Sequence, residues 1–179
     1  MKMKIGLVSG LAFCLGCSSV AVPSAQQTVS EPSASAVAAV RPALVKVAVG
    51  QRQPLGQLTD IQGQVVDLQQ PNKRKLLIFF ATWCGDSKRL MQQLTQSPLL
   101  ADKELLIVAI GREEQPQTLK EFAAEYKLPL HFIADSDRML YQQFTDRGIP
   151  RVVLVNEQNV VVKTFLGEIP RAIDEIVWP

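Results

Sequence analysis

One cysteine, Cys84, stands where this sequence can do chemistry. It follows a continuous apolar run at residues 76–80 and precedes a stretch whose apolar residues have helical spacing. A thiol in the first turn of a helix meets unpaired backbone N–H groups and the positive end of the helix dipole, which stabilise the thiolate. A thiolate so placed can attack a disulfide and form a mixed disulfide. The sequence therefore predicts thiol–disulfide exchange at Cys84.

The residue three positions after the thiol is Ser87, so the chain has one sulfur where two would be needed to resolve a mixed disulfide internally. We expect the Ser87 hydroxyl to donate a hydrogen bond to the Cys84 sulfur. Lys88 and Arg89 add positive potential in the first turns, and Asp86 opposes it. Release of the bound substrate then requires a second thiol, as in an isomerase or a deglutathionylase.

The elements that must position this thiol can be predicted from the spacing of apolar residues. Residues 58–68 alternate around a glycine-containing turn and predict a hairpin. Strands are expected at 75–80, 105–110, 131–134, 151–156 and 160–166, and helices at 84–96, 115–126, 138–144 and 170–177. Residues 43–49 could form a short edge strand. This order predicts an α/β domain with a central mixed β-sheet flanked by helices.

Three sequence features resemble one family. The hairpin precedes the central strand, an A-T-W-C motif ends at Cys84, and a G-I-P motif ends at Pro150, just before the strand that starts at Arg151. Together they resemble the thioredoxin superfamily, and specifically its exported redoxin branch of the TlpA/ResA type, across residues 55–179. The resemblance implies a thioredoxin-like fold with an added N-terminal β-hairpin.

The same resemblance implies roles for residues around the thiol. It implies that Pro150 is cis and that the backbone of Ile149 and Pro150 pairs with an extended substrate peptide. Trp83 would contact substrate or pack on the loop, and Arg151 could orient a carboxylate. The implied partners are protein or peptide thiols and disulfides, with small thiols of the glutathione type, and no cofactor.

The chain also departs from the family pattern. The usual C-x-x-C is C-x-x-S, and apolar Ile78 and Leu90 stand six residues before and after Cys84, where relatives often carry an acid. Leu77 and Ala81 occupy the proline and threonine places of the peroxiredoxin pattern, which excludes a peroxidase of that kind. Two functions stay open: monothiol exchange through Cys84, or a redox-inactive binding module or scaffold at the cell envelope.

The N-terminus reads as an export signal. Residues 1–16 carry Lys2 and Lys4, then a short apolar run that ends before Cys17. The ending resembles a lipoprotein signal, with Cys14 where leucine is usual, so we expect Cys17 to be lipidated. The alternative is cleavage after residue 21, which would release the protein. Residues 17–50 predict a flexible tether, and residues 51–179 the thioredoxin-like domain.

The net charge and the remaining side chains argue against nucleic-acid binding and against a metal site. Removing Lys2 and Lys4 from the 19 basic residues leaves 17 against 17 acidic ones, so no basic surface for nucleic acid is expected. A lone His131 without clustered cysteines does not predict a metal site. Residues 111–114 follow a strand end, where ligands bind in open α/β sheets, but a solvated loop with a helix cap is favoured there. The predicted location is the periplasmic side of the outer membrane, held by the lipid.

Overall fold

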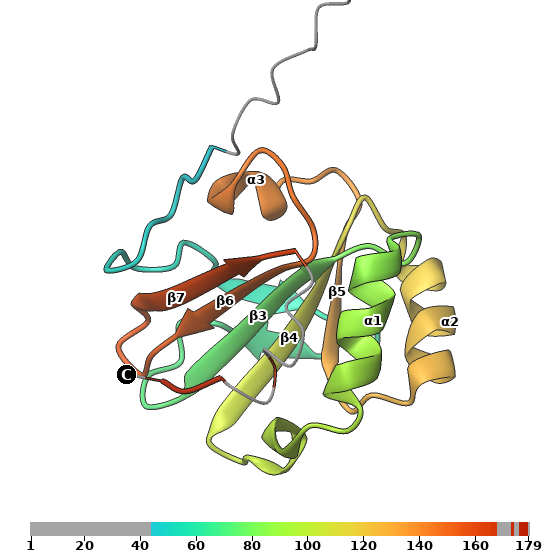
Figure 1. The fold of residues 1–179 in the computed structure, drawn as a ribbon, viewed down its shortest axis with the longest axis horizontal. Helices are drawn as coiled ribbons and strands as arrows, with labels where there is room; N and C mark the ends of the chain where they lie inside the picture. The colour runs from blue at the N-terminus through green and yellow to red at the C-terminus, as the bar shows by residue number, and fades with distance from the viewer. Residues whose placement is uncertain (1–43, 168–172, 174–175, 179) are drawn as a thin grey trace, which may run out of the picture. The chain divides into compact units, whose positions relative to one another are not determined.

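The computed structural model describes residues 44–167, 173 and 176–178 of the 179-residue chain. Its centre is a five-stranded sheet in the order β5-β4-β3-β6-β7 (Figure 1). The strands are β3 (Arg74–Phe80), β4 (Leu105–Arg112), β5 (His131–Asp135), β6 (Arg151–Val155) and β7 (Val161–Leu166). β3 pairs in parallel with β4 and antiparallel with β6, so the predicted mixed sheet is confirmed.

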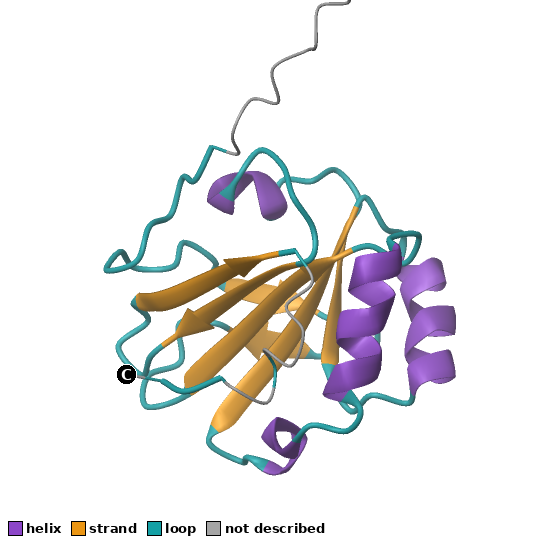
Figure 2. Cartoon of the chain, in the orientation of Figure 1, coloured by secondary structure: helices purple, strands orange, loops and turns teal. Residues whose placement is uncertain are grey.

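β3 is central because both of its faces are apolar. Its alternate side chains enter two separate cores, and residues 76–80 are fully buried. One face, with Ile78 and Phe80, packs under α1 (Gly85–Leu94) and α2 (Pro116–Tyr126). Figure 2 shows these two helices side by side on that face; the short 3₁₀ helix η1 (Pro98–Ala101) follows α1 in the chain.

The opposite face of the sheet is covered by α3 (Tyr141–Phe144) and by the predicted hairpin, β1 (Gln57–Thr59) with β2 (Val65–Asp67). The hairpin turn is organised by Asp60, whose Oδ1 accepts the backbone N–H groups of Gln62 and Gln64. Its other carboxylate oxygen lies 2.8 Å from Nδ1 of His131, within hydrogen-bond distance, so this contact joins the turn to β5.

The helix predicted at 138–144 is shorter than expected and covers only 141–144. Arg138 adopts a positive φ of 64°, which a continuous α-helix does not allow. The buried carboxylate of Asp135 accepts the backbone N–H groups of Leu140 and Tyr141. This side chain caps the chain locally and delays the start of the helix, as aspartate commonly does.

The strand predicted at 43–49 is wrong in its described part, because only an isolated bridge joins Val45 to Thr145. The same segment is tied to the domain by hydrogen bonds from Lys46 N to Phe144 O and from Gly50 N to Val161 O, each 2.8 Å. The predicted signal, Cys17 and most of the tether lie outside the described residues. Of the helix predicted at 170–177, only positions 173, 176 and 177 are described.

A lysine lies inside the domain at the start of the central strand. Lys75 is fully buried, and its ammonium donates to the carbonyl of Gln70 and to Oδ1 of Asn159, in the turn between β6 and β7. Burial lowers the pKa of Lys75, and the charges of Asp67 and Glu157 offset part of that shift.

In the part of the chain that is described, no helix has the length and apolar character to cross a membrane.

Candidate active site around Cys84

Cys84 occupies the N-cap position of α1, directly after the central strand. Its backbone is extended, with φ −87° and ψ 120°, and its carbonyl accepts the N–H of Lys88 at 3.0 Å. The side chain is partly exposed, and the Sγ atom lies 4.0 Å from the carbonyl oxygen of Ile149. The Ile149–Pro150 peptide is cis, as the resemblance implied. The thiol therefore faces the backbone of residues 148–150, which we call the Pro150 loop.

Ser87 lies beneath the loop that carries the thiol, residues 81–84, which we call the Cys84 loop. Ser87 is fully buried, and its Oγ accepts the backbone N–H of Ala81 at 3.3 Å. The structure records no hydrogen bond between Ser87 and the sulfur of Cys84. Ser87 thus holds the base of the Cys84 loop, and its expected donation to the sulfur stays a prediction.

A buried carboxylate that sequence reasoning missed holds the other side of the Cys84 loop. Glu114, between β4 and α2, is 4% exposed, and its Oε1 accepts both the backbone N–H of Thr82 at 2.6 Å and its hydroxyl at 2.7 Å. Residues 111–114 were expected to form a solvated loop, which is wrong for Glu114. The available signal was position, since β4 lies beside β3 and its carboxyl end adjoins the Cys84 loop.

The Pro150 loop is held in place by contacts from three directions. Gly148 has a φ of 94°, and a Cβ atom at this position would collide with Leu166 Cδ1. The hydroxyl of Tyr141 donates to the Gly148 carbonyl at 2.8 Å, and Gly167 N donates to the Pro150 carbonyl at 2.8 Å. The backbone that faces the thiol is therefore fixed by α3 and by the end of β7.

Arg151, which we expected to orient a substrate carboxylate, points into the domain instead. It is 4% exposed, and its guanidinium lies 3.5 Å from the hydroxyl oxygen of Thr164 and 3.4 Å from that of Thr145. Burial lowers the pKa of Arg151, and the neighbouring Tyr141 and Asp146 partly offset this. The Arg151 side chain is therefore directed away from the surface on which Cys84 opens.

Trp83 is the most exposed side chain of the Cys84 loop, at 63%. The guanidinium of Arg112, at the end of β4, lies 5.9 Å from the centre of its ring, within range of a cation–π contact. Trp83 therefore presents an aromatic face beside the thiol. The loop on which it stands is fixed from below by Ser87 and Glu114.

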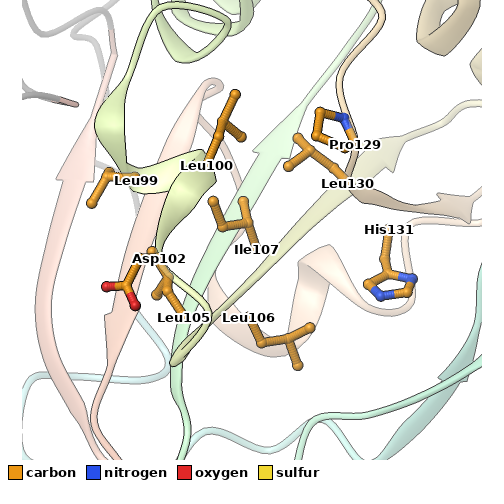
Figure 3. A pocket seen from close by; sticks show the side chains of 9 residues that line it. All are labelled: Leu99, Leu100, Asp102, Leu105, Leu106, Ile107, Pro129, Leu130 and His131. Carbon is orange, nitrogen blue, oxygen red and sulfur yellow. The ribbon is translucent and has the colours of Figure 1, made fainter.

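A small pocket lies at the other end of the sheet, away from Cys84 (Figure 3). Its volume is about 130 Å³, and leucines of η1 and β4 line it together with Leu130 and His131. These residues precede or begin the parallel strands, whereas Cys84 follows the carboxyl end of β3, where ligands bind in open α/β sheets. Within the described residues, no group of three or more His, Cys, Asp or Glu side chains is arranged to hold a metal ion.

Two curated relatives resemble about three fifths of this chain. The sporulation thiol-disulfide oxidoreductase A of Bacillus subtilis is 23% identical over 60% of this chain and 67% of its own length. The thiol-disulfide oxidoreductase ResA of Halalkalibacterium halodurans is 24% identical over 62% of this chain and 64% of its own. The chain thus spans about two thirds of these relatives.

Solved structures carry the same fold. A secreted disulfide oxidoreductase from Mycobacterium tuberculosis superposes with a TM-score of 0.55 at 18% identity, over 64% of this chain and 83% of that one. StoA from Bacillus subtilis superposes with a TM-score of 0.55 at 21% identity, over 65% of this chain and 90% of that one. The fold is therefore thioredoxin-like. The family model described as Redoxin matches residues 48–176, and the chain belongs to the redoxin family.

Proposed function

We propose that this protein is an exported thiol–disulfide exchange protein that acts through the single thiol of Cys84. The observation that carries the proposal is the placement of the Cys84 sulfur. It is partly exposed at the N-terminus of α1 and lies 4.0 Å from the Ile149 carbonyl. The two curated relatives are thiol–disulfide oxidoreductases by name, and they match the same domain.

The exchange proceeds in two balanced steps. The Cys84 thiolate attacks one sulfur of a substrate disulfide, the S–S bond breaks, and the released thiolate takes a proton from water. Ser87 has no sulfur with which to resolve the resulting mixed disulfide. A second thiolate, from the substrate or from a small thiol, therefore attacks it and returns Cys84 as thiolate. Bonds are exchanged with no net oxidation, so the reaction needs no cofactor.

The Pro150 loop supports recognition of an extended peptide. The Ile149 carbonyl lies 4.0 Å from the thiol sulfur. The exposed side chain of Trp83 precedes Cys84, and that of Leu166, at the end of β7, lies against Gly148 of the Pro150 loop. A backbone edge flanked by apolar side chains suits the addition of a peptide strand. The same surface favours the second candidate, a redox-inactive module that grips peptides without using the thiol.

Export and anchoring form part of the same proposal. The basic and apolar residues of 1–16 support a signal peptide, and Cys17 is the proposed lipidation site, with release as a soluble protein as the alternative. One structural relative is a secreted protein, which agrees with export. We propose that the domain works on the periplasmic side of the outer membrane, on protein or peptide disulfides.

The test is alkylation of Cys84 as a function of pH, followed by trapping of mixed disulfides. A chain beginning at residue 18 carries Cys84 as its only cysteine. The exchange proposal predicts that folded Cys84 is alkylated at pH 7 several times faster than the same residue in urea, as expected of a thiol that attacks disulfides. It also predicts covalent partners that Cys84→Ser loses.

The two candidates separate on Cys84→Ser and Ser87→Cys. A binding module keeps its partners when Cys84 is replaced by serine, and it shows no faster alkylation in the folded state. The exchange protein loses its covalent partners on that change. Ser87→Cys supplies a resolving thiol, so mixed disulfides should then be released as a disulfide forms between Cys84 and the introduced thiol. Slow alkylation with retained partners would reject exchange.

A further inference from the structure

Two partly exposed arginines converge on one aromatic ring beside the Cys84 site. The guanidinium carbons of Arg112 and Arg138 lie 5.3 Å and 5.8 Å from the centre of the Tyr141 ring. Their side chains are 17% and 28% exposed. Contact with a buried ring restricts both side chains, so their guanidinium groups are pre-organised at a site that solvent still reaches.

A single carboxylate lies between these two arginines. Glu113 accepts from Arg112 at 2.8 Å and lies 3.5 Å from the Nη1 of Arg138. It is a non-glycine residue with a positive φ of 60°, and its side chain is 39% exposed. One carboxylate therefore serves two guanidinium groups. The Nε atoms of Arg112 and Arg138 are buried without a hydrogen-bond partner, so the terminal Nη groups that contact Glu113 are the donors that a ligand would reach.

The other carboxylates on this side of the domain already have partners. Asp135 is buried and accepts two backbone N–H groups, and burial raises its pKa. Asp137 accepts the N–H of Met139, and Asp146 lies 3.8 Å from Nε of Arg147. Glu113 is therefore the acidic group that an incoming anion would have to displace from Arg112 and Arg138.

The arginine pair adjoins both halves of the thiol site. Arg112 also lies under the ring of Trp83, the residue before Cys84. Tyr141, on which both arginines stack, donates its hydroxyl to the carbonyl of Gly148 in the Pro150 loop. A group held by Arg112 and Arg138 therefore lies next to the surfaces that would contact a disulfide bound at Cys84.

We propose that Arg112 and Arg138 form a carboxylate-recognition site for the disulfide substrates of Cys84, with Glu113 occupying it when no substrate is bound. The proposal rests on the proposed exchange function and names its substrate class, a disulfide with a carboxylate near the sulfur. Acidic peptides and small thiols of the glutathione type both have this chemistry. Arginine suits such a ligand because its planar guanidinium can donate two parallel hydrogen bonds to one carboxylate.

The test measures non-covalent binding in the Cys84→Ser protein, so that it does not depend on thiol reactivity. The probes are a serine peptide flanked by glutamates, the same peptide with glutamines, and S-methylglutathione. At low salt we expect the glutamate peptide to bind about three- to tenfold more tightly than the glutamine peptide, the range for partly exposed charge pairs. S-methylglutathione distinguishes a small-thiol source from a peptide source.

Variants test whether the preference for the glutamate peptide arises at Arg112 and Arg138. Arg112→Gln should abolish it, Arg112→Lys should keep part of it, and Glu113→Gln should increase it about threefold because the competing charge is removed. Arg52→Gln is the matched control. Arg52 is exposed, and its backbone forms an isolated β-bridge with Val160, the residue before β7. It therefore lies at the opposite end of β7 from the Pro150 loop. It should leave the preference unchanged.

Equal binding of the two peptides, no measurable binding of either, or a preference that survives Arg112→Gln would each overturn the proposal. Exchange assays on the wild-type chain with an uncharged disulfide separate this result from the proposed function. Exchange without a carboxylate preference means that only the recognition site is wrong. A carboxylate preference in Cys84→Ser, with no exchange by the wild type, means that only the exchange function is wrong.

Discussion

The hydrogen bonds from Thr82 to Glu114 should stabilise both the domain and the Cys84 loop. The carboxylate is 4% exposed and accepts two hydrogen bonds, at 2.6 Å and 2.7 Å, from a residue 32 positions earlier in the chain. A hydrogen bond to a charged group contributes about 1.5–3 kcal/mol. Both bonds share one oxygen and Thr82 is partly exposed, so we expect Glu114→Ala to lower the free energy of unfolding by about 2–3 kcal/mol.

Urea denaturation of a double-mutant cycle measures this contribution. Thr82→Val removes the hydroxyl and keeps the backbone N–H, so the coupling between Thr82→Val and Glu114→Ala should be about 1 kcal/mol or more. Glu121→Ala is the control, because Glu121 is exposed on α2 and accepts only from Gln117 among its recorded contacts. It should change stability by less than about 0.5 kcal/mol. A coupling near zero, or a Glu114→Ala as stable as the control, would refute this account of the loop.

Two further perturbations test the Pro150 loop and the hairpin. Gly148→Ala should destabilise the domain by about 1–2 kcal/mol in urea denaturation, chiefly from the positive φ, because the exposed Leu166 side chain can rotate away from the added Cβ; wild-type stability would contradict the loop geometry. Burial alone would raise the pKa of Asp60, but hydrogen bonds from His131, Gln64 and Gln62 bring it below its ordinary value of 3.8. The stabilisation from the ionised Asp60 is therefore present above pH 3.8 and is lost as the pH falls below that value through the lower folded pKa. Wild type should lose its stability advantage over Asp60→Asn across that acidic range. Parallel pH curves would contradict this.

The sheet and its two long helices could be predicted because their information is local. Six consecutive buried positions in β3 and the helical spacing after Cys84 are visible in the sequence. The hairpin was predictable for the same reason, since Gly63 and Asp60 lie within its own turn. Prediction failed where a side chain competes with the backbone for its hydrogen bonds: Asp135, five and six residues earlier, takes the N–H groups of Leu140 and Tyr141 and so keeps α3 from extending toward Arg138.

The candidate site was predictable at its centre and not at its periphery. Cys84 and Pro150 lie in short motifs, so their positions could be predicted from the sequence. The part played by Glu114 depends on Thr82, 32 residues earlier, and that of Arg112 depends on a ring at position 141. Arg151 adjoins Pro150 in sequence, but the start of β6 turns its side chain inward. The direction in which these side chains point depends on tertiary packing, and the spacing of residues in the sequence does not reveal it.

The antiparallel pairing of β3 with β6 makes the thiol a reporter of complete folding. Cys84 and Ile149 are 65 residues apart, and they meet because β6 inserts beside β3. Contacts this distant in the chain form slowly, since a long loop must close first. A chain that is still being synthesised would present Cys84 to other thiols before the Pro150 loop exists. The moment at which the Cys84 sulfur of a growing chain becomes protected from alkylation would then show when β6 pairs with β3.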